Sequence, residues 1–358
     1  MIKQLMVLML LSGSLLPGAL SAATYLLPEK GDSVIGAVSL TTSRHEDTIS
    51  DLAWAYDQGY REMRHANPNV DPWLPGDGTE IVIPGRYVLP DAPRKGIVIN
   101  VPEMRLYYYP KPRKGEPAEV VTYPISIGRQ DWATPYGKTS IISKIKDPTW
   151  TPPKSIKKEH AEMGDPLPDV VPAGPDNPLG LFAMRLGKRG YLIHGTNKPY
   201  GLGMRVTHGC IRLYPKDIEE IFTKVRVGTT VRIIDQPYKA GWLRGKLFLE
   251  AHPPLEEAKA DSQNEYQRLV NIISKASDAD RDGKLDWNSI RTISHEHSGI
   301  PLMVGVDITS DSLVSGAEDS DQSMVRAVKE VVIEPELIKS KSDDPSLQKS
   351  PSAYSELF

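Results

Sequence analysis

The chain contains one cysteine, Cys210, in a segment over 207–212 that reads Thr-His-Gly-Cys-Ile-Arg. A lone cysteine forms no internal disulfide, so it is an inert buried thiol, an intermolecular link or a nucleophile. Gly209 lets the backbone turn tightly before it, and Arg212 adds positive charge that favours a thiolate. These neighbours favour the nucleophile.

A nucleophilic cysteine needs a base, and imidazole has an ordinary pKa of about 6.5, which suits that role near neutral pH. Two histidines compete for it. His208 lies so close to Cys210 in the chain that the local backbone restricts its ring. His194 ends an apolar run and precedes Gly195, so it can approach the sulfur from a neighbouring strand. The residues favour His194 and leave His208 open.

Strands are expected to position these residues. Runs of β-branched and aromatic residues predict strands over 97–101, 105–109, 120–127, 139–145, 181–186, 191–194 and 229–234, and a helix over 215–225. The stretch 147–179 between them is crowded with proline and glycine. Such a long irregular stretch is typical of a binding loop or lid, and we expect it to border the active cleft.

Composition limits the class of protein. The chain has 358 residues, 39% hydrophobic and 25% charged, with a formal net charge of -3. This length predicts more than one domain. Lysines and arginines are spread along the chain without a basic block, which argues against nucleic acid as a partner. The 31 prolines favour loops and strand edges over a helical bundle.

Residues 1–23 have the pattern of a secretory signal peptide. Lys3 gives a positive start, the stretch from Leu5 to Leu20 is apolar, and small residues over 21–23 offer a cleavage site. The apolar stretch is interrupted by Pro17 and is shorter than the ~20 residues that a spanning helix needs. We therefore expect export, cleavage and no membrane anchor in the mature protein.

Residues 38–86 predict a small mixed unit. Thr48 is a candidate helix N-cap, a second helix is expected over 60–66, and the run 80–84 predicts a closing strand. With the turns at 67–68 and 74–76, this order resembles a lysin-motif (LysM) module, a family that binds the glycan strands of peptidoglycan. The resemblance implies a βααβ fold. An alternative is a small stabilising cap, because no glycan-binding side chain can be named.

The motifs at 194–196 and 207–212 resemble the signature of the YkuD-type L,D-transpeptidase catalytic domain, and the resemblance covers residues 96–235. It implies that Cys210 is the nucleophile and His194 the general acid and base, with the carbonyl of Gly195 orienting the ring. The amides of His208, Gly209 and Cys210 are expected to hold the oxyanion. Arg212, Trp150 and Thr196 are expected to contact the stem peptide.

The resemblances imply a fold class: a mostly β catalytic domain, a YkuD-like β-sandwich with a short helix, after a small βααβ LysM module and before a helical or disordered C-terminal extension. They also imply a periplasmic enzyme without cofactor or metal. In this family the thiolate attacks the carbonyl at the L-centre of the third stem residue, usually meso-diaminopimelate, in a tetrapeptide of peptidoglycan, and D-alanine leaves.

The resemblance leaves the acyl acceptor open. A second stem peptide yields a 3-3 crosslink, and the C-terminal lysine of an outer-membrane lipoprotein yields an anchor between that membrane and the wall. The two-module layout resembles the lipoprotein-attaching members, and the stretches 150–153 and 174–180 also match that branch. The alternatives are an L,D-carboxypeptidase or hydrolase that uses water, and a non-catalytic LysM wall-binding protein.

Beyond Pro237 we expect the β character to end. Residues 236–318 predict a partly helical extension, with a charged helical stretch over 256–276, and residues 319–358 have the composition of a disordered tail.

Two weaker patterns lie in the extension. The loop 278–286 resembles the start of an EF-hand, but Ser289 takes the place of the bidentate glutamate, so a solvated acidic turn is favoured over a weak calcium site. His295 and His297 are spaced poorly for one metal ion and are expected on a solvated surface.

Overall fold

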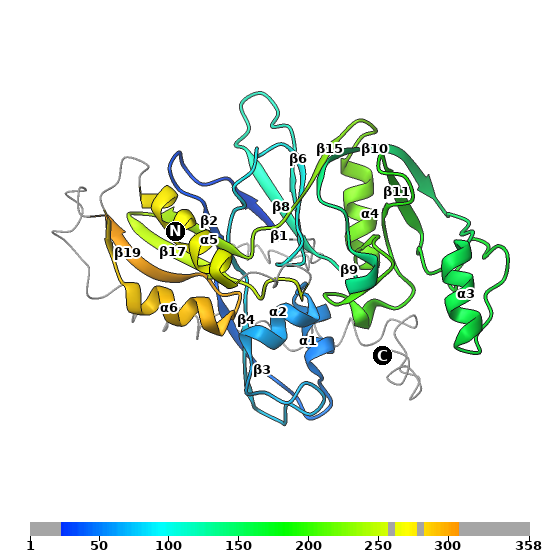
Figure 1. The fold of residues 1–358 in the computed structure, drawn as a ribbon, viewed down its shortest axis with the longest axis horizontal. Coiled ribbons are helices and arrows are strands. Elements are labelled where there is room, and N and C mark those ends of the chain that lie inside the picture. The colour runs from blue at the N-terminus through cyan, green and yellow to red at the C-terminus, as the bar shows by residue number, and fades with distance from the viewer. Residues whose placement is uncertain (1–22, 257–261, 278–282, 308–358) are drawn as a thin grey trace, which may run out of the picture.

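The computed structural model describes residues 23–256, 262–277 and 283–307, and Figure 1 shows their arrangement. The largest element is a nine-stranded sheet with the order β1-β8-β7-β6-β15-β10-β11-β12-β14. Its strands are β1 (Ala23–Leu26), β6 (Gly96–Asn100), β7 (Arg105–Tyr109), β8 (Glu119–Pro124), β10 (Gly137–Lys146), β11 (Phe182–Leu186), β12 (Leu192–His194), β14 (Ile211–Arg212) and β15 (Thr230–Ile234).

Neighbouring strands of this sheet are antiparallel, except that β6 pairs with β15, and β12 with β14, in parallel. The predicted strand over 120–127 is divided into β8 and the short β9 (Ile127–Gly128), which pairs with β13 (Arg205–Thr207). The mostly β fold class is confirmed. Short 3-10 turns lie at Gln130–Trp132 and Pro199–Gly201.

Alternate residues of a strand face the same side, so one face of the curled sheet packs on the main hydrophobic core. Ile97 and Ile99 of β6 pack in one cluster with residues of β11 and β12. Helix α4 (Pro215–Lys224), close to its predicted bounds, adds Ile218 to that cluster. Val98, between the two isoleucines, faces the opposite side and packs against the N-terminal strands.

The N-terminal unit has the predicted order of strand, helix, helix and strand. It consists of β3 (Ser39–Thr42), α1 (Ile49–Ala55), α2 (Tyr60–Ala66) and β4 (Glu80–Ile83), and β3 is antiparallel to β4. Thr48 caps α1 as predicted, since its hydroxyl accepts from the amide of Asp51 at 3.1 Å. A further pair, β2 (Val34–Gly36) and β5 (Arg86–Val88), lies in the same part of the chain.

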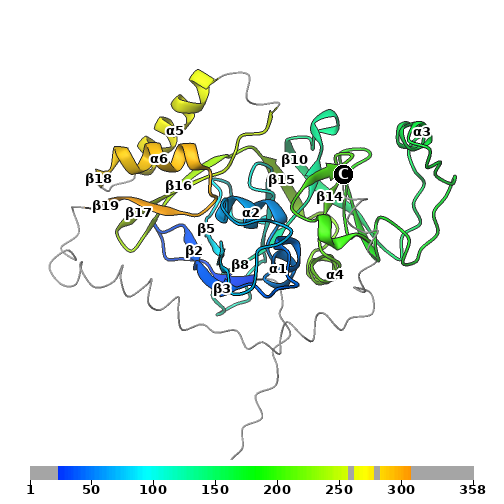
Figure 2. The same ribbon diagram turned by 90° about the horizontal axis from the view of Figure 1, so that it is seen from below.

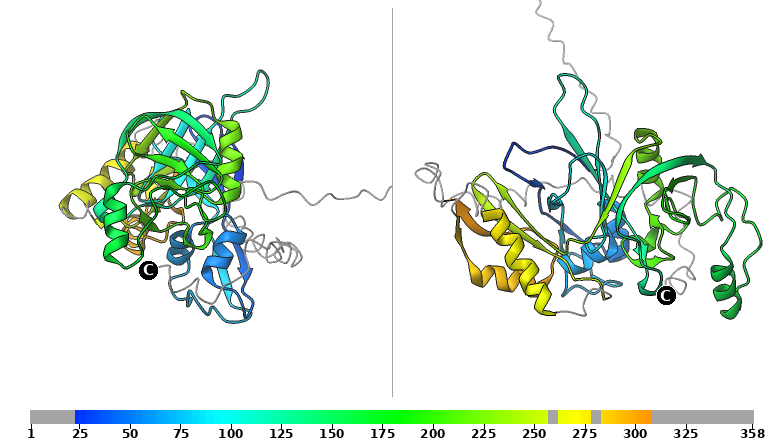
Figure 3. Two further views of the ribbon diagram at one scale, coloured as in Figure 1. Left: turned by 90° about the vertical axis from the view of Figure 1, so that its right-hand side faces the viewer. Right: turned by 45° about the horizontal axis from the view of Figure 1, so that its top comes forward.

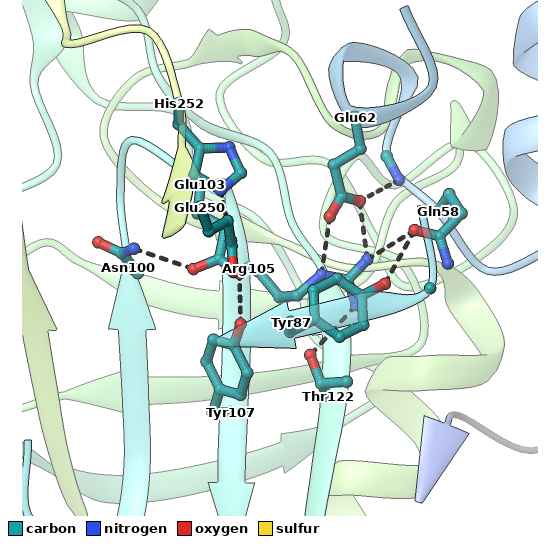
Figure 4. A network of polar contacts seen from close by, with 12 residues as sticks. Gln58, Glu62, Tyr87, Asn100, Glu103, Arg105, Tyr107, Thr122, Glu250 and His252 are labelled. Atoms are coloured by element: carbon teal, nitrogen blue, oxygen red, sulfur yellow. Dashed lines mark hydrogen bonds and ion pairs between the residues drawn. The ribbon is translucent and has the colours of Figure 1, made fainter. Parts of the chain in front are cut away.

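Helix α2 packs closely against the segment that leads into β13. Gly203 has φ +81°, and a Cβ there would lie 2.4 Å from the Cα of Gly59, so a larger residue does not fit. Arg105 of β7 is buried beside this contact and donates to both carboxylate oxygens of Glu62, at 2.7 and 2.8 Å (Figure 4). A bidentate ion pair therefore joins α2 to the sheet.

The expectation that β character ends at Pro237 is wrong. The following residues form a four-stranded sheet in the order β16-β17-β19-β18, seen at the left of Figure 1 with two helices. The elements are β16 (Tyr238–Leu243), β17 (Lys246–Ala251), α5 (Ser262–Ser277), β18 (Gly283–Leu285), α6 (Trp287–Glu296) and β19 (Leu302–Asp307). The segment is also partly helical, as predicted.

The strands were missed because their sequence pattern is broken. Lys239 and Gly241 interrupt the apolar residues of β16. Arg244 and Gly245 form the turn to β17 with φ +50° and +75°, a two-residue hairpin connection that lacks the usual Asn-Gly or Asp-Gly pair.

Lys239 joins this C-terminal unit to the large sheet. Its buried ammonium lies 2.7 Å from a carboxylate oxygen of Glu103 and 2.8 Å from one of Glu250. It also donates to the carbonyl of Val88 at 2.8 Å. Figure 4 shows the two carboxylates meeting beside His252, whose Nε2 lies 2.6 Å from Glu250. The C-terminal unit is thus attached through compensated buried charges.

The irregular stretch over 147–179 contains a helix that was not expected, α3 (Lys154–Glu162). The helix projects from the body of the molecule at the right of Figure 1 and Figure 2, and the views in Figure 3 agree. Ile156 is its one buried residue, so no apolar periodicity marked it in the sequence.

Several predictions fall outside the described residues: the signal peptide up to residue 22, the tail 319–358 and the part 278–282 of the acidic loop. Asp286, which ends that loop, caps α6 by accepting from the amides of Asn288 and Ser289 at 3.0 and 3.2 Å. Within the described ranges, no helix combines the length and the apolarity needed to cross a membrane.

Candidate active site

The parallel strands β12 and β14 bring the cysteine and the favoured histidine together. His194 ends β12 and pairs with Arg212 of β14, and Cys210 stands directly before β14. Paired residues share a face of a sheet, and so do residues two positions apart on one strand. The side chains of His194, Arg212 and Cys210 therefore gather on one face at the edge of the nine-stranded sheet.

The ring of His194 is 4% exposed, and its Nδ1 lies 2.7 Å from the carbonyl oxygen of Gly195. A carbonyl only accepts, so Nδ1 carries the hydrogen and Nε2 is the basic nitrogen. Burial lowers the pKa of His194 to about 3, and the charge of Arg212 acts in the same direction. The imidazole is therefore neutral at rest.

The thiol of Cys210 is also neutral at rest. Burial raises its pKa, although a backbone hydrogen bond from Leu192 and the charge of Arg212 lower it. Arg212 thus favours the thiolate, as expected from the sequence, but burial outweighs it. The sulfur lies 3.8 Å from the carbonyl oxygen of Gly190. A neutral thiol and a neutral imidazole suit activation by a general base at the moment of attack.

The turn that presents the cysteine is held in place by two threonines. Thr207 Oγ1 donates to the carbonyl of Cys210 at 2.6 Å, and Thr134 Oγ1 donates to the carbonyl of Gly209 at 3.0 Å. Thr134 was not singled out in the sequence, because it lies far from the motif along the chain.

The backbone of this turn bends at a glycine in the left-handed region. Gly209 has φ +95°, and a Cβ there would lie 2.7 Å from a ring carbon of Tyr191. Among the described residues, the amides of His208, Gly209 and Cys210 donate to no loop carbonyl. Successive amides in such a turn can converge on an oxyanion.

Arg212 is anchored by its backbone, which exchanges hydrogen bonds with Ser126 at 2.9 and 3.0 Å. In the part of the chain that the structure describes, its buried Nε has no hydrogen-bond partner. A guanidinium with an unused buried donor suits a carboxylate ligand.

The ring of His208 contacts Glu159 and Trp132. Its Nε2 lies 2.9 Å from Glu159 of α3, and its ring packs edge-on against Trp132 with centroids 5.2 Å apart. Arg129 lies 2.5 Å from the same carboxylate. Hydrogen bonds from Arg129 and His208 lower the pKa of Glu159. This arrangement favours His194 over His208 as the base, and it shows that the irregular stretch reaches the site.

Trp150 and Thr196, the other residues predicted to contact the substrate, form their hydrogen bonds with other parts of the chain. Trp150 is partly buried and exchanges backbone hydrogen bonds with Val171 at 2.8 and 2.9 Å. Thr196 is buried, and its hydroxyl accepts from the amide of Lys198 at 2.9 Å. No hydrogen bond among the described residues joins either side chain to Cys210.

Away from this site, the carboxylates of Glu103 and Glu250 and the ring of His252 lie within 4.8 Å of one another. Three such groups could hold a metal ion. Lys239 Nζ, however, already bonds to both carboxylates. The ion pairs account for the cluster.

The chain is similar to known proteins of one family. The family model of the YkuD L,D-transpeptidase catalytic domain matches residues 94–233. The protein named "Probable L,D-transpeptidase ErfK/SrfK" of Escherichia coli is 40% identical over 79% of this chain and 91% of its own length. "Probable L,D-transpeptidase YbiS" of the same species is 44% identical over 70% of this chain and 81% of its own. The solved catalytic domain of the E. faecium L,D-transpeptidase is 23% identical, with a TM-score of 0.29, and the match covers 40% of this chain and 100% of that one. The chain belongs to the L,D-transpeptidase family.

Proposed function

We propose that this L,D-transpeptidase works in the periplasm, with Cys210 as the nucleophile and His194 as the general acid and base. The observation that supports the assignment is the parallel pairing of β12 with β14, in which His194 lies opposite Arg212 and Cys210 stands directly before β14. The hydrogen bond from His194 Nδ1 to Gly195 supports it, because this bond leaves Nε2 for proton transfer.

The proposed reaction has two halves. His194 Nε2 takes the thiol proton as the sulfur of Cys210 attacks the carbonyl of the third residue of a tetrapeptide stem. The bond to D-alanine breaks, and the protonated His194 gives its proton to the leaving amine. An acceptor amine then attacks the thioester and loses its proton to His194, and the thiol is restored.

The surroundings supply the other roles. The amides of His208, Gly209 and Cys210 are proposed to bind the oxyanion, and each such donor is worth about 3 kcal/mol in the transition state. Arg212 would hold an anionic group of the stem, since its buried Nε has no partner among the described residues. Trp150 and Thr196 are proposed as further stem contacts.

Intact mass spectrometry with a disaccharide tetrapeptide tests the first half. We expect wild-type protein to gain a covalent adduct and release D-alanine, while Cys210→Ala forms none. A folded wild-type protein with a reduced thiol that yields neither adduct nor D-alanine would support the alternative, a wall-binding protein without activity.

The acceptor is the second part of the proposal, and we favour the C-terminal lysine of an outer-membrane lipoprotein over a second stem peptide. The acyl-enzyme should be offered a peptide that ends in lysine, a tetrapeptide stem or buffer alone. Transfer to the lysine peptide is the expected product. Tripeptide released at one rate in all three mixtures would instead identify an L,D-carboxypeptidase that uses water.

The N-terminal unit is proposed to bind the glycan strand as a LysM module, supported by its strand, helix, helix and strand order. Co-sedimentation with peptidoglycan stripped of stem peptides separates sugar binding from stem binding. Protein left wholly in the supernatant would reduce the unit to a stabilising cap.

A further inference from the structure

Two amides of the proposed oxyanion site meet at His208. Its Cα connects the peptide unit that carries the His208 amide to the unit that carries the Gly209 amide, and both units are planar. The relative direction of the two amides therefore depends on the two backbone torsions of His208. Gly209 has φ +95°, and as a glycine it has no side chain that could restrict the turn. Contacts that fix the side chain of His208 therefore restrict both amides.

The turn packs on the end of β9 and the residue after it. A Cβ on Gly128 would lie 2.9 Å from the Cα of Gly209, so the two backbones are in close contact. The amide of Arg129 donates to the carbonyl of Thr207 at 3.0 Å. These contacts fix the backbone on either side of His208, while its imidazole extends to other partners.

The imidazole of His208 contacts side chains from separate elements. Its ring packs edge-on against Trp132, with centroids 5.2 Å apart. Its Nε2 lies 2.9 Å from one carboxylate oxygen of Glu159, and Arg129 lies 2.5 Å from the other. The hydrogen bonds from Arg129 and His208 lower the pKa of Glu159, so this side chain is ionised at neutral pH. An ionised carboxylate only accepts, so His208 Nε2 carries the hydrogen.

Glu159 differs from its charged neighbours on α3. Lys157 pairs with Asp169, and Lys158 pairs with Glu162, all within the irregular stretch. The partners of Glu159 lie instead next to β9 and β13, in the catalytic domain. Since α3 projects from the body of the molecule in Figure 1, this carboxylate joins the helix to the turn that carries the cysteine.

We propose that Glu159 is a positioning residue for the acyl transfer: it fixes the imidazole of His208 and, through it, the amides that bind the oxyanion. The inference rests on the proposed function, because it assigns Glu159 to the oxyanion step of that reaction. Glu159 contacts no reacting atom in this role. A misplacement of about 1 Å can cost about 100-fold in rate, so a side chain away from the reacting atoms can control the chemical step.

Single-turnover acylation of the full chain by a disaccharide tetrapeptide, measured over a range of peptide concentrations, separates binding from chemistry. In Glu159→Gln we expect the maximal acylation rate to fall by about 10- to 100-fold. The half-saturating peptide concentration should change by less than about twofold, because the proposed stem contacts remain. Glu162→Gln, at an exposed ion pair of the same helix, is the control and should acylate at the wild-type rate. A wild-type maximal rate in Glu159→Gln would overturn the proposal, and a raised half-saturating concentration at that rate would assign Glu159 to peptide binding instead.

A double-mutant cycle tests the route through His208. The variant His208→Ala lacks the imidazole, so adding Glu159→Gln to it should slow acylation by less than about twofold further. An equal loss of rate with and without the imidazole would show that Glu159 acts through Arg129 or through the helix alone. That result would also overturn the proposal.

Nuclear magnetic resonance relaxation dispersion gives a second readout, which needs no chemistry. Once the carboxylate is removed, the turn should exchange between conformations on the microsecond-to-millisecond timescale. We expect this exchange at the amides of His208, Gly209 and Cys210 in Glu159→Gln and not in Glu162→Gln. Flat dispersion profiles in both variants would contradict the proposal. Failure of the wild type to form an acyl-enzyme would count against the proposed function, and relaxation dispersion would still decide whether Glu159 fixes the turn.

Discussion

At the scale of the residue, the histidine proposed as the base is held by a backbone carbonyl, whereas many nucleophilic sites use a carboxylate. The carbonyl of Gly195 fixes the tautomer of His194, but it brings no negative charge to stabilise an imidazolium. Arg212 adds an unfavourable positive charge. The resting pair with Cys210 is therefore neutral, in contrast to a thiolate–imidazolium pair.

The rate of thiol alkylation as a function of pH tests whether Cys210 and His194 are neutral at rest. Because burial raises the pKa of Cys210, we expect iodoacetamide to react slowly at neutral pH and faster as the pH rises above the ordinary cysteine range. His194→Gln should leave the shape of the profile unchanged. A fast plateau that begins near pH 5 and disappears in His194→Gln would reveal a pre-formed ion pair.

Gly209→Ala tests the turn. The residue has φ +95°, and the new Cβ would lie 2.7 Å from Tyr191, so the amides of the turn should shift. We expect kcat to fall by about 100-fold or more, as for the loss of an oxyanion donor. Gly228→Ala is the control, because Gly228 also has a positive φ but has nothing within 4 Å of its Cβ position. Equal activities of the two variants would refute this role.

At the scale of the element, α3 contacts the site through one side chain. Glu159 accepts from His208 and Arg129, while the helix has a single buried residue, Ile156. An element with little buried apolar surface depends on such contacts for its position.

Removing the carboxylate should loosen α3. In Glu159→Gln we expect amide hydrogens over 154–162 to exchange about two- to fivefold faster, in the range of partly exposed ion pairs. Glu162→Gln on the same helix is the control, because its ion pair with Lys158 is solvent-exposed. The same exchange rate in both variants would show that Glu159 does not hold the helix.

The elements also show how far one sequence could predict this fold. Strands such as β6 and β7 were found because their apolar runs are continuous and locally encoded. Helix α3 was missed because it buries almost nothing, and β16 because Lys239 enters a buried ion pair whose partners lie far away in the chain. Long-range compensation of this kind has no local pattern.

The same limit applies to the candidate site. Cys210, His194 and Arg212 could be named because the motifs containing them are short and chemically distinctive. In the structure His194 lies opposite Arg212 in the pair of β12 and β14. Glu159 and Thr134 could not, because their contacts depend on the tertiary arrangement of separate segments. The catalytic roles themselves remain predictions.

At the scale of the whole molecule, buried charges connect the three parts of the chain. Arg105 pairs with Glu62 of the N-terminal unit, and Glu103 pairs with Lys239 of the C-terminal unit. Removal of one partner leaves an uncompensated buried charge, so these contacts make the parts interdependent.

Arg105→Met should therefore lower the free energy of unfolding by about 3–5 kcal/mol. In urea unfolding, the double variant Glu62→Gln, Arg105→Met should lose less free energy of unfolding than the two single variants lose together. Arg113→Met, at an exposed pair with Glu116, is the control and should change stability by less than about 0.5 kcal/mol. A small effect of Arg105→Met would show that the ion pair does not stabilise the contact between α2 and the large sheet.

Acid should destabilise the molecule through two histidines, the buried His194 and the partly buried His65. The pKa values of His65 and His194 are about 4 and about 3 in the folded protein, below the ordinary 6.5, so the unfolded chain binds more protons below pH 6.5. Stability should fall as the pH drops from 6.5 towards 4. In urea unfolding measured at pH 7, 6 and 5, His65→Gln should make the stability less dependent on pH. If stability falls with pH equally in the wild type and in His65→Gln, His65 makes no contribution.

The close packing of Gly59 against Gly203 has a geometric consequence for the cell wall. The amides of Tyr60 and Arg61 also bond to the carbonyls of Leu202 and Gly203, just before the strand that leads into the catalytic turn. With the N-terminal unit bound to a glycan strand, this contact would set a fixed distance between the bound sugar and the stem peptide that is attacked. The positions of modified stems along a strand would then follow the repeat of the glycan.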